Sequence, residues 1–156
     1  MRRKIYEQLV QWKEHEQGHV ALLIEGARRV GKSYIVEEFA QKEYKSYILV
    51  DFAHITKPLK RVFDDYLEDT DTFLLYLQHV TGKKLYARES LIIFDEIQKY
   101  PRARQAIKHL VADGRYHYIE TGSLVGINSQ AEDILEPSEE RPLTLYSMDF
   151  EEWVWA

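Results

Sequence analysis

The fold of this chain is decided by residues 20–33, which read Val20-Ala21-Leu22-Leu23-Ile24-Glu25-Gly26-Ala27-Arg28-Arg29-Val30-Gly31-Lys32-Ser33. The apolar run at 20–24 predicts a strand that is buried on both faces. The two glycines let the backbone after this strand curl so that its N–H groups point toward one place. The segment 32–41 then has apolar residues at helical spacing. A strand, a G-x-x-x-x-G-K-S loop and a helix, in that order, predict a phosphate-binding loop.

This loop indicates how a nucleoside triphosphate would be held. The loop N–H groups and the positive end of the helix dipole would face the phosphates. Lys32, a predicted catalytic residue, can reach the β- and γ-phosphates, and the Ser33 hydroxyl can ligate magnesium. Arg28 and Arg29 could touch phosphate, a neighbouring subunit, a missing part of the chain or only solvent. The residues predicted to bind the nucleotide are Gly26, Ala27, Arg28, Arg29, Val30, Gly31, Lys32, Ser33 and Tyr34.

A second motif is Leu91-Ile92-Ile93-Phe94-Asp95-Glu96, an apolar run that ends in two acids. In an open parallel sheet, ligands bind at the carboxyl ends of the strands. We therefore expect Asp95 to hold magnesium, usually through a water, and Glu96 to polarise the attacking water. Taken alone, two acids after a strand are often only surface carboxylates. Their position downstream of the phosphate-binding loop favours the functional interpretation.

Other candidate site residues are indicated less directly. The stretch 118–123 predicts a strand that ends in hydroxyl residues, and either Thr121, our first choice as a catalytic residue, or Ser123 could sense the γ-phosphate or position the water. A plain Thr-Gly-Ser turn is equally compatible with this stretch. Gln98 could join the water network of the nucleotide. Four arginines could stabilise a transition state, but no spacing selects one, so each is expected to be an ordinary surface residue: Arg102, Arg104, Arg115 and Arg141.

The remaining segments alternate between strand and helix patterns. Such alternation argues for an α/β domain with a mostly parallel sheet. Helices are predicted over Arg3–His15 and Ala103–Ala112 and twice within Lys57–Tyr86, strands over Tyr47–Val50, Tyr116–Glu120 and Leu143–Ser147, and a loop or short helix over Ser129–Glu140.

Composition excludes several classes of site. The 156 residues include no cysteine, which excludes disulfides, thiolate catalysis and cysteine–zinc sites. The net charge of −5 offers no broad basic field for nucleic acid. No apolar run approaches the roughly 20 residues of a membrane span, and no signal peptide is visible, so we expect a cytoplasmic domain. His54, His109 and His117 lack metal-ligand spacing and are expected on the surface or in packing contacts, and the tyrosines are expected in the core.

Together these motifs resemble a family of predicted bacterial and archaeal ATPases of the AAA+ superfamily, in which a C-terminal domain of unknown function follows the ATPase. The resemblance covers nearly the whole chain. It rests on a first helix like 5–12, on the loop at 23–33, on the acid-acid-Ile-Gln pattern in 94–101, on Thr-Gly-Ser at 121–123 and on the ending at 143–153.

The resemblance implies a three-layer P-loop NTPase fold that binds ATP and Mg²⁺ and hydrolyses the nucleotide. It also implies a parallel five-stranded sheet in the order 5-1-4-3-2, with one strand between the phosphate-loop strand and the acid strand. In residue ranges, that order is Leu143–Ser147, Val20–Glu25, Tyr116–Glu120, Leu91–Phe94 and Tyr47–Asp51.

Three departures accompany the resemblance. Met148 and Asp149 stand where the family usually carries Pro-Leu, and Glu120 stands where an apolar residue is expected. The chain ends at Ala156, whereas family members continue into a helical segment and the C-terminal domain. We therefore expect residues 1–156 to be one truncated or isolated ATPase core with low turnover. Its partner would be the missing domain or another protein.

Three other functions share the phosphate-binding loop. An ATP-gated interaction module would bind the nucleotide with little turnover. A P-loop kinase would need an acceptor pocket and an arginine-rich lid, and no clear lid sequence is found. A GTPase is less favoured because no Asn-Lys-x-Asp stretch is present to recognise guanine.

Overall fold

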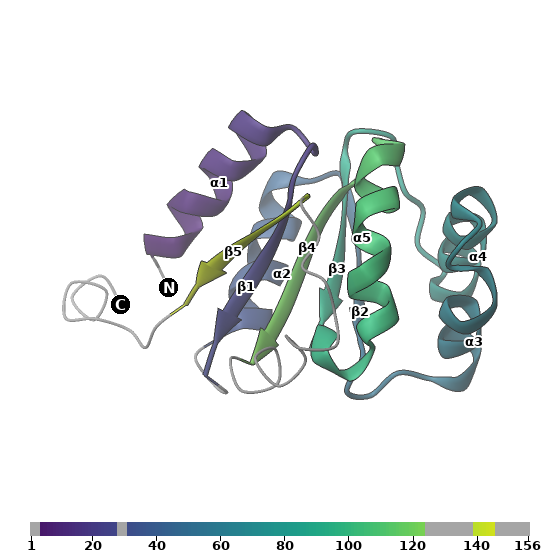
Figure 1. Cartoon of the computed structure of the whole chain (residues 1–156). Helices are drawn as coiled ribbons and strands as arrows, with labels where there is room; N and C mark the ends of the chain where they lie inside the picture. Colours follow the sequence, from purple (N-terminus) through teal and green to yellow (C-terminus); the bar gives the residue numbers. More distant parts are fainter. Residues whose placement is uncertain (1–3, 28–30, 124–138, 146–156) are drawn as a thin grey trace.

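The structure is a computed structural model that describes residues 4–27, 31–123 and 139–145 of the chain. Within these ranges, helices and strands alternate as the apolar patterns predict (Figure 1). The elements are α1 (Lys4–Glu16), β1 (Ala21–Gly26), α2 (Lys32–Glu43), β2 (Ser46–Asp51), α3 (Lys57–Tyr66), α4 (Thr70–Thr81), β3 (Ser90–Asp95), a 3₁₀ turn η1 (Ile97–Lys99), α5 (Pro101–Asp113), β4 (His117–Ser123) and β5 (Glu140–Thr144).

The five strands form one sheet in the order β2-β3-β4-β1-β5, and every pair is parallel. This confirms the predicted strand order, because β4 lies between the phosphate-loop strand β1 and the acid strand β3. The register pairs Gly26 with Ser123 and Phe94 with Glu120, so the ends of the central strands lie side by side. The end of the phosphate-loop strand and the end of the acid strand therefore meet at one edge of the sheet.

Helices cover both faces of the sheet, which makes three layers (Figure 1). Successive residues of a strand point to opposite faces. Thus Leu22 and Ile24 pack with α1 and α2, whereas Ala21 and Leu23 pack with the cluster that contains α3, α4 and α5. Burial on both sides explains why β1 and β3 read as continuous apolar runs.

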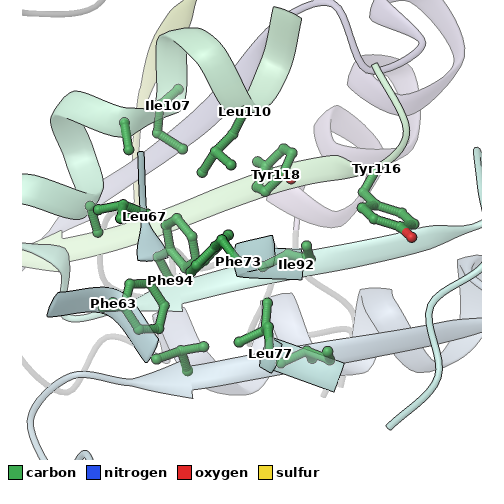
Figure 2. Close-up of a cluster of buried hydrophobic side chains, with 14 of the residues drawn as sticks. Phe63, Leu67, Phe73, Leu77, Ile92, Phe94, Ile107, Leu110, Tyr116 and Tyr118 are labelled. Atoms are coloured by element: carbon green, nitrogen blue, oxygen red, sulfur yellow. The ribbon is translucent and has the colours of Figure 1, made fainter. Parts of the chain in front are cut away.

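Aromatic rings fill the core between β3 and the pair α3–α4 (Figure 2). The Phe63 ring lies edge-on to Phe94 and Phe73, with centroids 5.6 and 5.0 Å apart. Edge-to-face pairs of this kind contribute about 0.5–1.5 kcal/mol beyond area burial. This packing therefore holds β3 in place at Phe94, the residue directly before the two acids.

Several boundaries differ from the prediction. α5 begins two residues early, at Pro101, because proline suits the first helical position. β4 continues beyond Glu120 through Ser123, because β1 pairs with it that far. The fifth strand occupies Glu140–Thr144 and starts three residues before the predicted strand, so the predicted loop or helix at Ser129–Glu140 was wrong at its last residue. Residues 129–138 and the predicted end at 146–156 lie outside the described residues.

Among the described residues, no helix is long and apolar enough to cross a bilayer. The longest helices, α1 and α5, have 13 residues each, whereas a membrane-spanning helix needs about 20 apolar residues.

Candidate functional site

The candidate site lies where β1, β3 and β4 end and α2 begins. β1 ends at Gly26 and β3 at Asp95, and α2 starts at Lys32. Of the predicted nucleotide-binding residues, the structure describes Gly26, Ala27 and 31–34, while Arg28, Arg29 and Val30 lie outside the described residues. The parallel topology thus brings together two motifs that are about 60 residues apart in the sequence.

The end of the phosphate-binding loop has the geometry that its glycine predicts. Gly31 has φ 90°, a left-handed conformation that side chains disfavour, and α2 begins directly after it. The Lys32 ammonium donates to the carbonyl oxygens of Gly26 and Ala27, at 3.2 and 2.8 Å. Lys32 is only 5% exposed, so its charge is held against the loop. A phosphate placed in the loop would find this cation in reach.

Ser33 and Asp95 meet directly, because the Ser33 hydroxyl donates to Asp95 Oδ1 at 2.7 Å. Burial raises the pKa of the Asp95 carboxyl, and the hydroxyls that donate to it oppose this shift. The nearby carboxylates of Asp51 and Glu96 raise the pKa further. A hydroxyl and a buried carboxylate are oxygen ligands of the kind that magnesium uses, together with water and phosphate oxygens. The donor set therefore fits this ion.

Thr121 connects the two acids. Its hydroxyl donates to Asp95 Oδ1 at 2.5 Å and accepts the backbone N–H of Glu96 at 3.1 Å. The side chain is fully buried. Since its one hydroxyl proton is given to Asp95, Thr121 is placed to hold the acids in position. Ser123, the second choice from the sequence, lies at the end of β4 beside Gly26.

Glu96 adopts an unusual backbone conformation for a residue other than glycine, with φ 58° and ψ 51°. Such conformations persist where the surrounding structure imposes them, often at functional sites. Two groups hold this residue, since Thr121 accepts its N–H and the Gln98 amide donates to its carboxylate Oε2. The structure therefore brings Gln98 to the site through Glu96.

Tyr34, the last predicted nucleotide-binding residue, has its side chain 64% exposed in the first turn of α2. Three of the four candidate arginines lie on the surface, as expected. Arg115 pairs with Asp71 and Asp113, Arg141 pairs with Glu16, and Arg102 donates to the Asp64 carbonyl.

The expectation for Arg104 was wrong, because Arg104 lies on the buried side of α5 and is only 4% exposed. Its guanidinium binds Glu140 with Nη2 2.8 Å from Oε1 and Nε 3.2 Å from Oε2. The sequence could not reveal this pair, because the partners are 36 residues apart and belong to different elements. A buried guanidinium is stable only with such a partner.

Glu120 belongs to the same buried region and is fully buried. Its carboxyl faces the Glu140 carboxylate, to which it donates a hydrogen bond when it is protonated. Burial raises the pKa of this carboxyl well above its usual value, the Glu140 carboxylate raises it further, and Arg104 opposes both effects. The position faces the core, as the expected apolar residue would. Glu120, which stands where the family resemblance leads us to expect an apolar residue, is therefore a buried acid.

At the opposite edge of the sheet, His117 is a packing residue, as predicted. Its Nδ1 lies 2.7 Å from the Tyr44 hydroxyl, and its ring lies edge-on to Trp12. Burial lowers the pKa of His117 to about 4, so the ring is neutral at pH 7. A cavity of about 850 Å³ adjoins His117 and Gly18 and contains none of the predicted site residues. Among the described residues, no three His, Cys, Asp or Glu side chains gather as a metal site.

The chain matches a protein-family model described as an AAA domain over residues 19–154. A structure of C. elegans PCH-2 is similar with a TM-score of 0.48 and 10% identity, covering 94% of this chain and 42% of that chain. A crystal structure of Pif1 helicase from Candida albicans has a TM-score of 0.48 and 15% identity, covering 98% of this chain and 41% of that chain. The chain thus spans less than half the length of these structures. No curated protein matches the sequence.

Proposed function

We propose that this chain, which belongs to the AAA domain family, binds ATP with Mg²⁺ and hydrolyses the bond between the β- and γ-phosphates. The observation that supports this best is the continuous chain of hydrogen bonds from Ser33 through Asp95 and Thr121 to Glu96. It links the helix after the phosphate-binding loop to both acids. Such a link suits a reaction in which phosphate, metal and water must be positioned together.

The phosphate-binding half of the site would act on the ground state. Lys32 and the loop N–H groups would neutralise the phosphates, and the loop carbonyls that now hold Lys32 would release it to them. Ser33 and Asp95 would hold magnesium, which supplies positive charge to the phosphate oxygens when bound. These contacts to phosphate and magnesium would form when ATP binds, before the chemical step, so they would contribute mainly to ATP affinity.

The second half would act during the chemical step. Water attacks the γ-phosphorus while the bond to the β–γ bridging oxygen breaks, and ADP leaves with that electron pair. The Glu96 carboxylate accepts the proton that the attacking water loses. This interaction is made only in the transition state, so it serves turnover more than affinity.

A second candidate is an ATP-gated interaction module with little turnover. The arginines considered above are engaged elsewhere: Arg104, Arg115 and Arg141 form ion pairs, and Arg102 binds a carbonyl. A transition-state arginine contributes about 10³–10⁵-fold in phosphoryl transfer. We expect such a residue to come from Arg28, from Arg29 or from a partner, which would be another protein or a further domain. If the partner supplies it, turnover by this chain alone would be slow.

Two substitutions test the division of roles. Lys32→Ala should lower ATP affinity by at least about tenfold, because it removes the buried cation. Glu96→Gln should leave affinity within about twofold and slow turnover by about 10²–10⁴-fold, because an amide cannot accept the proton. Nucleotide titration and phosphate release would be measured for both variants, with the exposed Lys108→Ala as the matched control.

Equal losses of affinity in Lys32→Ala and Glu96→Gln would contradict the roles. Transfer of phosphate to an added acceptor, in place of water, would identify a kinase. ATP binding without turnover in the wild type at any protein concentration would favour the interaction module.

A further inference from the structure

We infer that Gln98 is a positioning residue for hydrolysis, which orients the Glu96 carboxylate toward the attacking water. This inference rests on the proposed function, since it assigns a task within the same site. It is carried by the amide–carboxylate hydrogen bond and by the way the main chain at Glu96 is held.

The main chain around Glu96 is fixed from both sides. The Glu96 N–H is bound by Thr121, and the Glu96 carbonyl accepts the N–H of Lys99 at 3.0 Å. Ile97, which lies between Glu96 and Gln98, is fully buried in the core. The 3₁₀ turn Ile97–Lys99 therefore presents Gln98 from a rigid base.

The side chain of Glu96 needs a second restraint, because its rotatable bonds can carry the carboxylate away from a productive position. The Gln98 Nε2 supplies this restraint by donating to Oε2. One hydrogen bond occupies one oxygen and leaves Oε1 to accept a proton from water. A misplacement of about 1 Å can cost about 10²-fold in rate, so loss of this restraint should produce a measurable fall in kcat.

The chemistry of the donor also suits the task. A neutral amide orients the carboxylate without cancelling its charge. A lysine or arginine at this position would form a charge-assisted bond about twice as strong and would favour the ionised carboxylate over its protonated form. Glutamine therefore holds Glu96 while leaving it able to accept a proton.

The test is a double-mutant cycle with full kinetics. Gln98→Leu keeps the approximate size of the side chain and removes the donor. We expect it to lower kcat by about 10–100-fold with ATP affinity within about twofold. In the Glu96→Gln background, the same change should cost less than about twofold further, because residues that act as one unit are non-additive. Gln41→Leu, on the exposed side of α2, is the matched control and should behave as wild type.

Each result decides the question. An unchanged or raised kcat in Gln98→Leu would overturn the inference and leave the proposed function standing. An equal loss in the wild-type and Glu96→Gln backgrounds would show that Gln98 acts through something other than Glu96, and would also overturn it. A wild-type chain that releases no phosphate from Mg²⁺–ATP would overturn both the function and the inference. Thermal unfolding of each variant checks that the fold is retained.

Discussion

Glu120 and Thr121 are consecutive residues of β4, yet they enter two buried polar clusters with different properties. Alternation along a strand sends their side chains to opposite faces of the sheet. Thr121 joins Ser33, Asp95 and Glu96 in what we name the edge cluster. Glu120 lies with Arg104 and Glu140 in what we name the α5 cluster.

The two clusters differ in how deeply their polar groups are buried. In the edge cluster, the Ser33 hydroxyl joins α2 to β3, and the Thr121 hydroxyl joins β4 to the backbone of Glu96. Ser33 and Glu96 are only half-buried. In the α5 cluster all three side chains are buried, and two carboxyl groups, Glu120 and Glu140, share one cation, Arg104. The comparison teaches that buried polarity alone does not mark a functional site. We expect the edge cluster to control turnover and the α5 cluster to control stability.

The largest effect should come from breaking the ion pair of the α5 cluster. Arg104→Met leaves the Glu140 carboxylate buried without its partner, which should lower the free energy of unfolding by about 3–5 kcal/mol. Denaturant unfolding measures this loss. ATP affinity per folded molecule should stay within about twofold, because Glu140 pairs with Ala21 at the start of β1, the end opposite Gly26.

The control is the double variant Arg104→Met/Glu140→Met, which removes both charges and should recover most of the stability, since apolar replacements of buried pairs are often neutral. A double variant as unstable as the single one would mean that the ion pair is not what holds α5 against β5. If Arg104→Met instead lost turnover but kept its stability, the α5 cluster would act in the reaction, and the assignment of separate roles to the two clusters would be wrong.

Thr121→Val should lower turnover strongly and stability less than Arg104→Met does. Valine keeps the shape but removes the hydroxyl that joins Asp95 to the Glu96 N–H. We expect kcat to fall by about 10²-fold through misplaced acids and the free energy of unfolding to fall by about 1–3 kcal/mol through an unpaired N–H. Phosphate release and denaturant unfolding would be compared with Thr81→Val, whose hydroxyl binds Leu77 at the far end of α4. If Thr121→Val retained full turnover, the edge cluster would not control chemistry.

The last effect, the smallest per pH unit, concerns the pH dependence of stability at Glu120. The pKa of this carboxyl is raised in the folded state by burial, so its contribution to stability is greatest below the unfolded pKa and is lost as pH rises. Glutamine has no such dependence. Glu120→Gln should therefore match the wild type near pH 4 and become relatively more stable above it, by at most about 1.4 kcal/mol for each pH unit. Unfolding curves from pH 4 to 8 test this. Parallel curves for the two proteins would show that Glu120 keeps its ordinary pKa.

Much of the fold could be predicted because its signals are local. The apolar runs of β1 and β3, the glycine at the start of α2 and the helical spacing of α3 and α4 each depend on residues within about ten positions. The strand order 5-1-4-3-2 came from the family resemblance and is confirmed. The least accurate predictions concerned the ends of β4 and β5, where pairing with β1 decides how far each strand extends.

The sequence by itself determined the glycine loop between β1 and α2, the two acids at the end of β3 and the α/β alternation, because spacing and burial leave a periodic pattern in the residue order. Only the tertiary structure decided that Thr121 bridges Asp95 and Glu96, that Gln98 holds the Glu96 carboxylate in a left-handed turn and that Arg104 is buried against Glu140. The Thr121 and Arg104 contacts join residues that are 25 to 36 positions apart, and the Gln98 contact depends on a main chain that Thr121 holds in place. Such contacts depend on strand pairing and helix packing, which bring polar atoms within hydrogen-bond distance of one another although no local sequence pattern predicts it.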